Sequence, residues 1–210
     1  MLPQQMLLLA HDARRDRLDV ASTLVRGPLL RAAAVAELAL RGSLRAAGGW
    51  VERVAGARPG DPFLAAVLDA VPHDRPRRWL DVVDEDWHRA EDAVLDQLAA
   101  AGTLRTRRSR TWNLFPVRHA VLAEPARAQA LRDRVRDTVL GGHDPAGLPI
   151  GDAVLALLAA DGGVASTFDV REQHRHRDAF RAVAHRVESR LPGLREGTLY
   201  ALAARRAAAS

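Results

Sequence analysis

The chain has 210 residues, of which 48% are hydrophobic and 27% charged, an ordinary composition for a soluble globular protein. Its 31 basic residues are all arginine and exceed the 26 acidic ones, giving a formal net charge of +5. The absence of cysteine excludes disulfides, thiolate metal sites and cysteine nucleophiles, and no apolar run approaches the roughly 18 residues of a membrane span. The first twelve residues carry no basic leader, so a cytoplasmic location is expected.

The first half of the chain predicts helices joined by short turns. Residues 28–42 are apolar nearly all round, which is typical of a central bundle helix, and Gly42 is suited to end it. Residues 48–56 alternate in the manner of a short strand. Asp61 is suited to the N-cap of the next helix and Pro62 to its first position. Two more helices are expected over residues 76–83, with Trp79 and Leu80 inward, and 84–102.

Residues 103–117 predict a β-hairpin, with strands over 103–108 and 111–117 on either side of Ser109 and Arg110. Its first strand is basic and free of acids, and an apolar tip follows. The residues concerned are Arg105, Arg107, Arg108, Arg110, Trp112, Leu114 and Phe115. With Arg118 just beyond, the five arginines of this segment equal the excess charge of the whole chain.

The rest of the chain again predicts helices. Residues 124–142 are amphipathic, 149–163 are of a buried type, and 169–191 form one long charged helix before a last helix over 195–209. In the long helix, the side chains expected to point inward are Phe180, Val183 and Val187. No internal repeat or linker interrupts the pattern, so residues 1–210 are expected to form a single, mainly α domain with a central bundle helix and one protruding hairpin.

No catalytic, metal or cofactor site emerges from the motifs. His174 and His176 lie two residues apart, which on a helix turns their rings to different sides, so they cannot share one ion. The acids between Asp81 and Asp86 stand at a helix start, where they favour the helix dipole. Neither a phosphate-binding glycine loop nor a nucleophile elbow occurs. The sequence therefore predicts a protein that is not an enzyme.

The hairpin is open to three interpretations. Its apolar residues can fold into the core, or it can be the wing of a winged-helix nucleic-acid binder. Against the wing, the preceding helix has a polar face that would be repelled by DNA, and this face carries Glu91, Asp92, Asp96 and Gln97. The third interpretation is a membrane contact, in which each arginine near an anionic leaflet contributes about 1 kcal/mol and each buried apolar side chain about 1.5–3 kcal/mol. An oligomerising interaction protein without lipid binding is a further alternative.

Several segments in order along the chain resemble the Golgi phosphoprotein 3 family in its bacterial, actinobacterial-type branch. The most specific are "AELALRG", the turn "GDP" and "LFP" after the hairpin. The resemblance implies a mainly helical domain that binds membranes peripherally. Eukaryotic members recognise phosphatidylinositol 4-phosphate through a pocket of one tryptophan and several arginines and insert an apolar hairpin. They also self-associate through it and hold cytoplasmic tails of glycosyltransferases as adaptors.

The same resemblance implies where a lipid headgroup would bind. One pocket arginine corresponds to Arg31, the tryptophan falls near Ser22, and the other arginines fall at His88 and Glu91, with Arg89 close by. Arg31, His88 and Arg89 are therefore the expected headgroup-binding residues. Recognition of phosphatidylinositol 4-phosphate, preference for another anionic lipid, and loss of headgroup binding all stay open. The partners implied are anionic lipid on the inner face of the cell membrane, cytoplasmic tails of membrane proteins, and a second copy of the chain through the hairpin.

Overall fold

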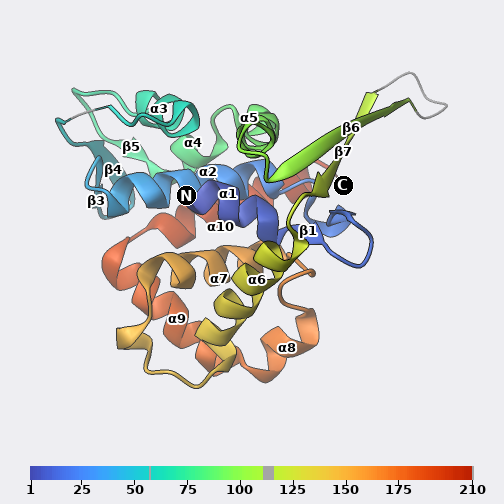
Figure 1. Cartoon of the computed structure of the whole chain (residues 1–210). Helices are drawn as coiled ribbons and strands as arrows, with labels where there is room; N and C mark the ends of the chain where they lie inside the picture. Colours follow the sequence, from blue (N-terminus) through green and yellow to red (C-terminus); the bar gives the residue numbers. More distant parts are fainter. Residues whose placement is uncertain (57, 111–115, 210) are drawn as a thin grey trace.

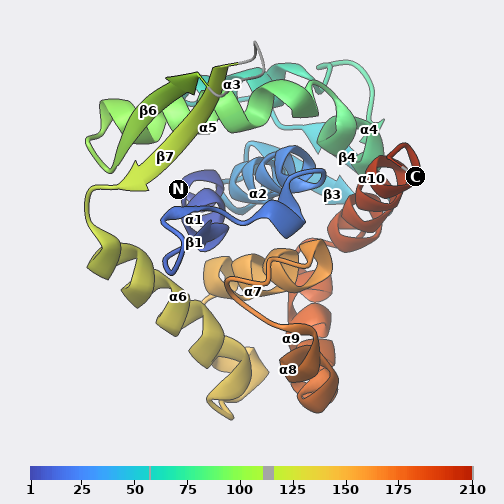
Figure 2. The same ribbon diagram turned by 90° about the vertical axis from the view of Figure 1, so that its right-hand side faces the viewer.

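A single buried helix, α2 (Arg26–Leu40), is the centre of the molecule. In a computed structural model, residues 1–56, 58–110 and 116–209 are described, with backbone only for 106–110 and 116–120. The helix lies in the middle in two perpendicular views (Figures 1 and 2) and packs against α1, α3, α4, α5, α7 and α10. Its leucines Leu29, Leu30 and Leu38 are fully buried. The prediction of a central helix over residues 28–42 is confirmed, because a helix that is apolar all round must be covered on every side.

The other helices lie around α2. On one side, together with the hairpin, lie α3 (Pro62–Asp69), α4 (Trp79–Asp84) and α5 (Trp87–Ala100), and on the opposite side lie α6 (Pro125–Leu140), α7 (Ile150–Gly162), α8 (Val170–Arg175) and α9 (Arg177–Arg190) (Figure 1). Helix α1 (Leu2–Leu9) lies beside α2, and α10 (Leu194–Ala207) packs against α4 and α2 (Figure 2). Their buried apolar side chains join in one contiguous core.

The strands form small antiparallel sheets at the periphery. They are β1 (His11–Asp12) with β2 (Arg17–Leu18), then β3 (Leu44–Ala47), β4 (Trp50–Arg53) and β5 (Arg77–Arg78), and finally β6 (Leu104–Arg110) with β7 (Pro116–Leu122). Two 3-10 turns complete the described structure, Val20–Ser22 and Pro145–Gly147. The mainly α class is confirmed, and so is the strand expected within residues 48–56, which is β4.

The predicted helix start at Asp61 is confirmed in detail. The Asp61 carboxylate accepts a hydrogen bond from the Leu64 amide at 2.8 Å, and Pro62 occupies the first helical position. In α4, Trp79 is fully buried as expected, whereas Leu80 is only half-buried against the core.

The prediction of one long helix over residues 169–191 is wrong. A capping box of Asp169 and Glu172 starts α8, which ends at Arg175. At His176 the backbone (φ −107°, ψ 25°) leaves the helical region before α9 begins. This break lets the ring of Phe180 on α9 pack edge-to-face against Phe168, with ring centroids 5.0 Å apart. Val183 is buried on α9, as expected.

The predicted hairpin is present, but its strands differ from the expected ones. Ser109 and Arg110, expected at the turn, belong to β6, because pairing continues from Leu104 opposite Leu122 to Arg110 opposite Pro116. Leu104 and Leu122 are buried and fix the base of the hairpin in the core. From there the two strands project away from the helices (Figure 1).

Candidate functional site

The hairpin concentrates positive charge on a projecting element. Arg105 is exposed at its base, and the strand register places Arg107 opposite His119 and Arg108 opposite Arg118. The tip residues Trp112, Leu114 and Phe115 lie outside the described residues, so their role as an apolar anchor stays a prediction. Five of the 31 basic residues lie between residues 104 and 122 without any acid, so the other 26 basic residues balance the 26 acids of the chain. The net charge of the protein is thus carried by the hairpin.

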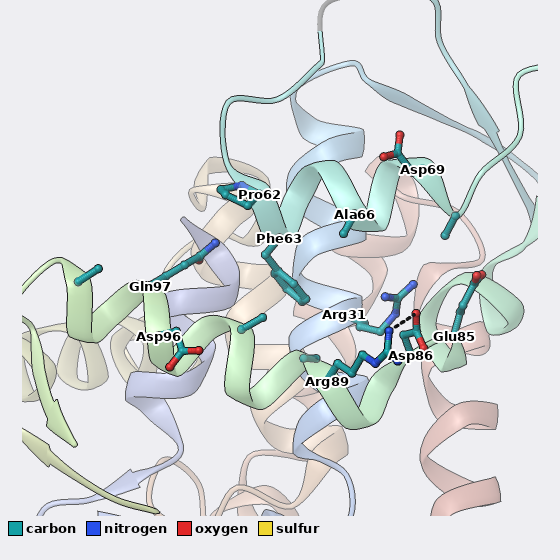
Figure 3. Close-up of a pocket in the computed structure, with 14 residues that line it drawn as sticks. Arg31, Pro62, Phe63, Ala66, Asp69, Glu85, Asp86, Arg89, Asp96 and Gln97 are labelled. Atoms are coloured by element: carbon teal, nitrogen blue, oxygen red, sulfur yellow. Dashed lines mark ion pairs between the residues drawn. The ribbon is translucent and has the colours of Figure 1, made fainter. Parts of the chain in front are cut away.

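A cavity of about 660 Å³ lies between α3 and α5, beside the predicted headgroup residues (Figure 3). Arg31 reaches it from α2 and Arg89 from α5. His88, by contrast, is exposed and does not line the cavity, and its ring lies against Trp87 with centroids 6.1 Å apart. The structure therefore brings two of the three expected headgroup residues together. The apolar part of the lining consists of Pro62, Phe63, Ala66, Ala70, Ala90, Ala93 and Ala100.

Arg31 lines this cavity and is anchored to the backbone by its guanidinium. The residue is 4% exposed, and its Nε and Nη2 donate to the Val82 carbonyl oxygen at 2.9 and 2.7 Å. No described residue forms a hydrogen bond with the third nitrogen, Nη1. Burial lowers the pKa of Arg31, and the nearby Glu85 and Asp86 oppose that shift. Because the ordinary pKa of arginine lies far above neutral pH, Arg31 stays a cation at neutral pH.

The cavity also carries acids, so it is not a purely basic pocket. Two of them are paired with arginines that do not line it: Asp69 with Arg53 and Arg58, and Glu85 with Arg77. A third, Asp86, lies 3.9 Å from Arg89, longer than a hydrogen bond. The fourth is Asp96. Both signs of charge therefore meet around an apolar floor.

The remaining headgroup positions suggested by the resemblance, Ser22 and Glu91, are closed by an internal ion pair. Arg26 is 4% exposed, and its Nη1 donates to both carboxylate oxygens of Glu91 at 2.8 and 2.9 Å. Its Nη2 donates to the Asp19 carbonyl oxygen at 2.6 Å and its Nε to the Ser22 hydroxyl at 3.3 Å. All three guanidinium nitrogens are thus occupied, which leaves Arg26 no free donor for a ligand.

Sequence reasoning missed Arg26, although a signal existed. An arginine at the start of an almost wholly apolar helix needs a partner, and an adjacent glycine points to a close helix crossing. A Cβ atom at Gly27 would lie 2.2 Å from the Trp87 carbonyl oxygen, so only glycine permits this approach of α2 to α5. The approach brings Arg26 within reach of Glu91.

A comparison with protein-family models identifies a family. The family model described as Golgi phosphoprotein 3 (GPP34) matches residues 2–209, nearly the whole chain. None of the curated proteins matches the sequence. Over residues 1–56, 58–110 and 116–209, no helix is both long and apolar enough to cross a membrane.

Proposed function

This chain belongs to the Golgi phosphoprotein 3 family, and from that premise we propose that it is a non-enzymatic peripheral membrane protein whose basic hairpin binds anionic lipid. The observation that carries the proposal is the placement of the entire net charge on β6, β7 and the residues between them. A positively charged element that projects from the protein is the first part to meet an anionic leaflet. The rest of the protein has no net charge, so the leaflet neither attracts nor repels it as a whole.

The expected strength of the contact is that of reversible binding. Three or four arginines at about 1 kcal/mol each, with partial burial of Trp112, Leu114 and Phe115, give on the order of 8 kcal/mol, which corresponds to a micromolar dissociation constant. Self-association of two copies would strengthen it by avidity. Salt weakens the arginine part because it screens exposed charges.

We assign the protein to the inner face of the cell membrane, where anionic headgroups face the cytoplasm. There it would act as an adaptor, with cytoplasmic tails of membrane proteins as its partners. Within the body, Arg31 and Arg89 are the residues placed to meet a lipid phosphate, since they reach the same cavity. His88 lies outside that cavity, and Glu91 is engaged with Arg26.

Vesicle flotation tests the proposal. The protein is mixed with phosphatidylcholine vesicles with or without 30 mol% phosphatidylglycerol, about a third of the lipid, at several salt concentrations. We expect binding only to the anionic vesicles and a steep loss when Arg105, Arg107, Arg108 and Arg110 are all changed to glutamine. Trp112→Ser with Phe115→Ser should weaken binding at every salt concentration.

The matched control changes four exposed arginines on α8 and α9, on the other side of the body from the hairpin (Figure 1). These are Arg171, Arg175, Arg177 and Arg181. Their change to glutamine alters the net charge by the same amount but should leave binding intact. Equal binding to neutral and anionic vesicles, or equal losses for the two sets of variants, would overturn the proposal.

A further inference from the structure

Large apolar side chains gather on the surface beside α10. Seven of them are exposed in the part of the chain that the structure describes, and three of the seven are Trp50, Leu199 and Tyr200. These three line two adjoining cavities of about 450 and 800 Å³, which share Glu196 and Tyr200. An exposed apolar cluster of this kind is typical of a surface that another protein covers.

We propose that the two cavities together form a docking groove for an acidic amphipathic segment of a partner protein. This α10 groove, defined by the lining of both cavities, is built from β4, α9, α10 and the residues between them. In two perpendicular views, α9 and the beginning of α10 lie away from the hairpin (Figures 1 and 2). A partner in the groove and a membrane at the hairpin would therefore not compete for one surface, and the inference does not depend on the membrane contact.

The centre of the groove supplies the apolar contacts. Tyr200 is 58% exposed and borders both cavities, with Trp50 on one side and Leu199 on the other. Ala184 and Pro192 add small apolar surface to the larger cavity. Tryptophan and tyrosine are enriched among the residues that contribute most to protein–protein binding, because their large rings lose much contact with water. The apolar face of an amphipathic segment fits this centre.

The groove is held in shape without a partner. The buried Trp79 indole Nε1 donates to the Gly48 carbonyl oxygen at 3.3 Å and to the Pro192 carbonyl oxygen at 3.0 Å. These bonds tie the β3–β4 turn to the turn between α9 and α10. Gly193 in the second turn has φ 85°, and a Cβ atom there would lie 2.8 Å from the Gly48 carbonyl oxygen. Only glycine permits so close an approach of the two turns.

Basic side chains stand on either side of the apolar centre. Arg78 is exposed, and its guanidinium carbon lies 5.3 Å from the centroid of the Trp50 ring. Arg181 lines the larger cavity from α9, one helical turn before His185. Arg181 pairs with Asp178 at 2.8 Å, but their side chains are 76% and 75% exposed. An exposed ion pair contributes little, so a carboxylate of the partner can replace Asp178.

The other charged residues of the groove are mostly engaged within the protein. Glu188 accepts a hydrogen bond from the Gly193 amide at 2.8 Å. Arg195 donates from two nitrogens to both carboxylate oxygens of Asp161, each at 2.9 Å. What faces a partner is thus two arginines and a histidine against one acid, Glu196. This balance favours a partner with acids flanking its apolar residues.

Fluorescence anisotropy with labelled peptides tests the inference on the full chain. The first peptide is an amphipathic helix of about 15 residues, with leucine and phenylalanine on one face and glutamate elsewhere. The second has lysine in place of every glutamate, and the third is a shuffled form of the first without an apolar face. We expect the first peptide to bind at least about tenfold more tightly than the other two. Equal affinities, or tightest binding of the lysine peptide, would overturn the proposal.

Charge reversal locates the site. Arg78→Glu combined with Arg181→Glu should reverse the preference, so that the lysine peptide binds more tightly than the glutamate peptide. Binding of the lysine peptide also shows that this variant is folded. Tyr200→Ser should weaken the glutamate peptide in the parent protein. The matched control is Arg171→Glu with Arg175→Glu, the same change of charge at exposed positions of α8 outside the groove, and it should keep the preference of the parent. A reversal by the control as well would assign the preference to overall charge and overturn the proposal.

The hairpin variants separate this inference from the proposed function. Changing Arg105, Arg107, Arg108 and Arg110 to glutamine should prevent flotation but leave binding of the glutamate peptide unchanged. Conversely, Arg78→Glu with Arg181→Glu should still float with anionic vesicles. If phosphatidylglycerol vesicles displaced the glutamate peptide from the parent protein, the groove would be a membrane contact and the docking proposal would fail.

Discussion

Arg26 and Arg31 are equally buried on the same helix, yet they do opposite things. Each is 4% exposed. All three guanidinium nitrogens of Arg26 donate to protein groups, and Nη1 donates to both carboxylate oxygens of Glu91. Arg31 donates from two nitrogens to the Val82 carbonyl oxygen and lines a cavity, and no described residue accepts a hydrogen bond from its third nitrogen. Burial alone therefore does not mark a binding residue, whereas a buried donor that the fold leaves unused does.

The largest loss of stability is expected when Arg26 loses its ion pair with Glu91. Glu91→Ala leaves the Arg26 cation buried and without its carboxylate. We expect a loss of about 3 kcal/mol in the free energy of unfolding, at the lower end for broken buried ion pairs because the Glu91 side chain is 32% exposed. Urea denaturation followed by circular dichroism measures it.

A double variant is the control for that experiment. Arg26→Leu combined with Glu91→Leu removes both charges and should recover most of the lost stability, because no uncompensated ion is left. A Glu91→Ala protein as stable as the parent would show that Arg26 finds solvent, and the contrast with Arg31 would collapse.

Variants of Arg31 should lose less stability than Glu91→Ala. Arg31→Met keeps an apolar stem but removes both donors to the buried Val82 carbonyl, and we expect a loss of about 2 kcal/mol. The loss is smaller than for Glu91→Ala because the charge itself disappears with the side chain. Arg31→Lys, which retains one donor, should lose less in the same denaturation experiment. If Arg31→Met were the more damaging of the two, its role would be mainly structural.

A more exposed ion pair shows how much of the contrast comes from burial. Arg136 on α6 donates to Glu172 on α8, and this hydrogen bond is the main reason that the pKa of Glu172 lies below its ordinary value of 4.5. With side chains 30% and 23% exposed, the pair should contribute only about 1 kcal/mol. Glu172→Gln should lose that amount at pH 7.

The pH dependence of this pair has a definite sign. A depressed folded-state pKa means that the contribution is complete above the unfolded value near 4.5 and disappears as pH falls through the folded value. The parent and Glu172→Gln should therefore differ in unfolding free energy at pH 7 and converge well below pH 4.5. A difference that persisted in acid would assign the effect to the α8 capping box, since Glu172 also accepts from the Asp169 amide.

Local signals in the sequence were enough for much of the fold. The all-round apolar pattern predicted the central helix, and Asp61 with Pro62 predicted the start of α3. The alternation of residues 48–56 predicted β4. The N-terminal helix α1 is too short for its periodicity to show, and its residues are fixed instead by contacts such as the Leu2 amide with Glu37, 2.7 Å away. The break at His176 accompanies the packing of Phe180 against Phe168, a contact that local periodicity does not record.

The site was less predictable because its defining contacts join distant segments. Arg26 and Glu91 lie 65 residues apart in sequence, and Arg31 and Val82 lie 51 apart. No local pattern records such pairs. The resemblance pointed to Arg31 and Arg89, which line the same cavity, and their role in headgroup binding stays a prediction. Only the structure shows that α3 supplies the other wall and that Ser22 and Glu91 contact Arg26. The hairpin, by contrast, is a local element, and its charge was readable directly.

Replacement of Arg89 should have the smallest effect on stability. Its side chain is 75% exposed and its ion pair with Asp86 spans 3.9 Å, so Arg89→Gln should change the free energy of unfolding by less than about 0.5 kcal/mol. If Arg89 meets a lipid phosphate as proposed, the same variant should lower binding to anionic vesicles several-fold. Glu91→Ala should show the reverse, a large loss of stability with binding unchanged at a temperature where the variant is folded. Were both variants to affect stability and binding in proportion, the two arginine sites would be one cooperative unit, and the distinction between a closed and an open buried arginine would not hold.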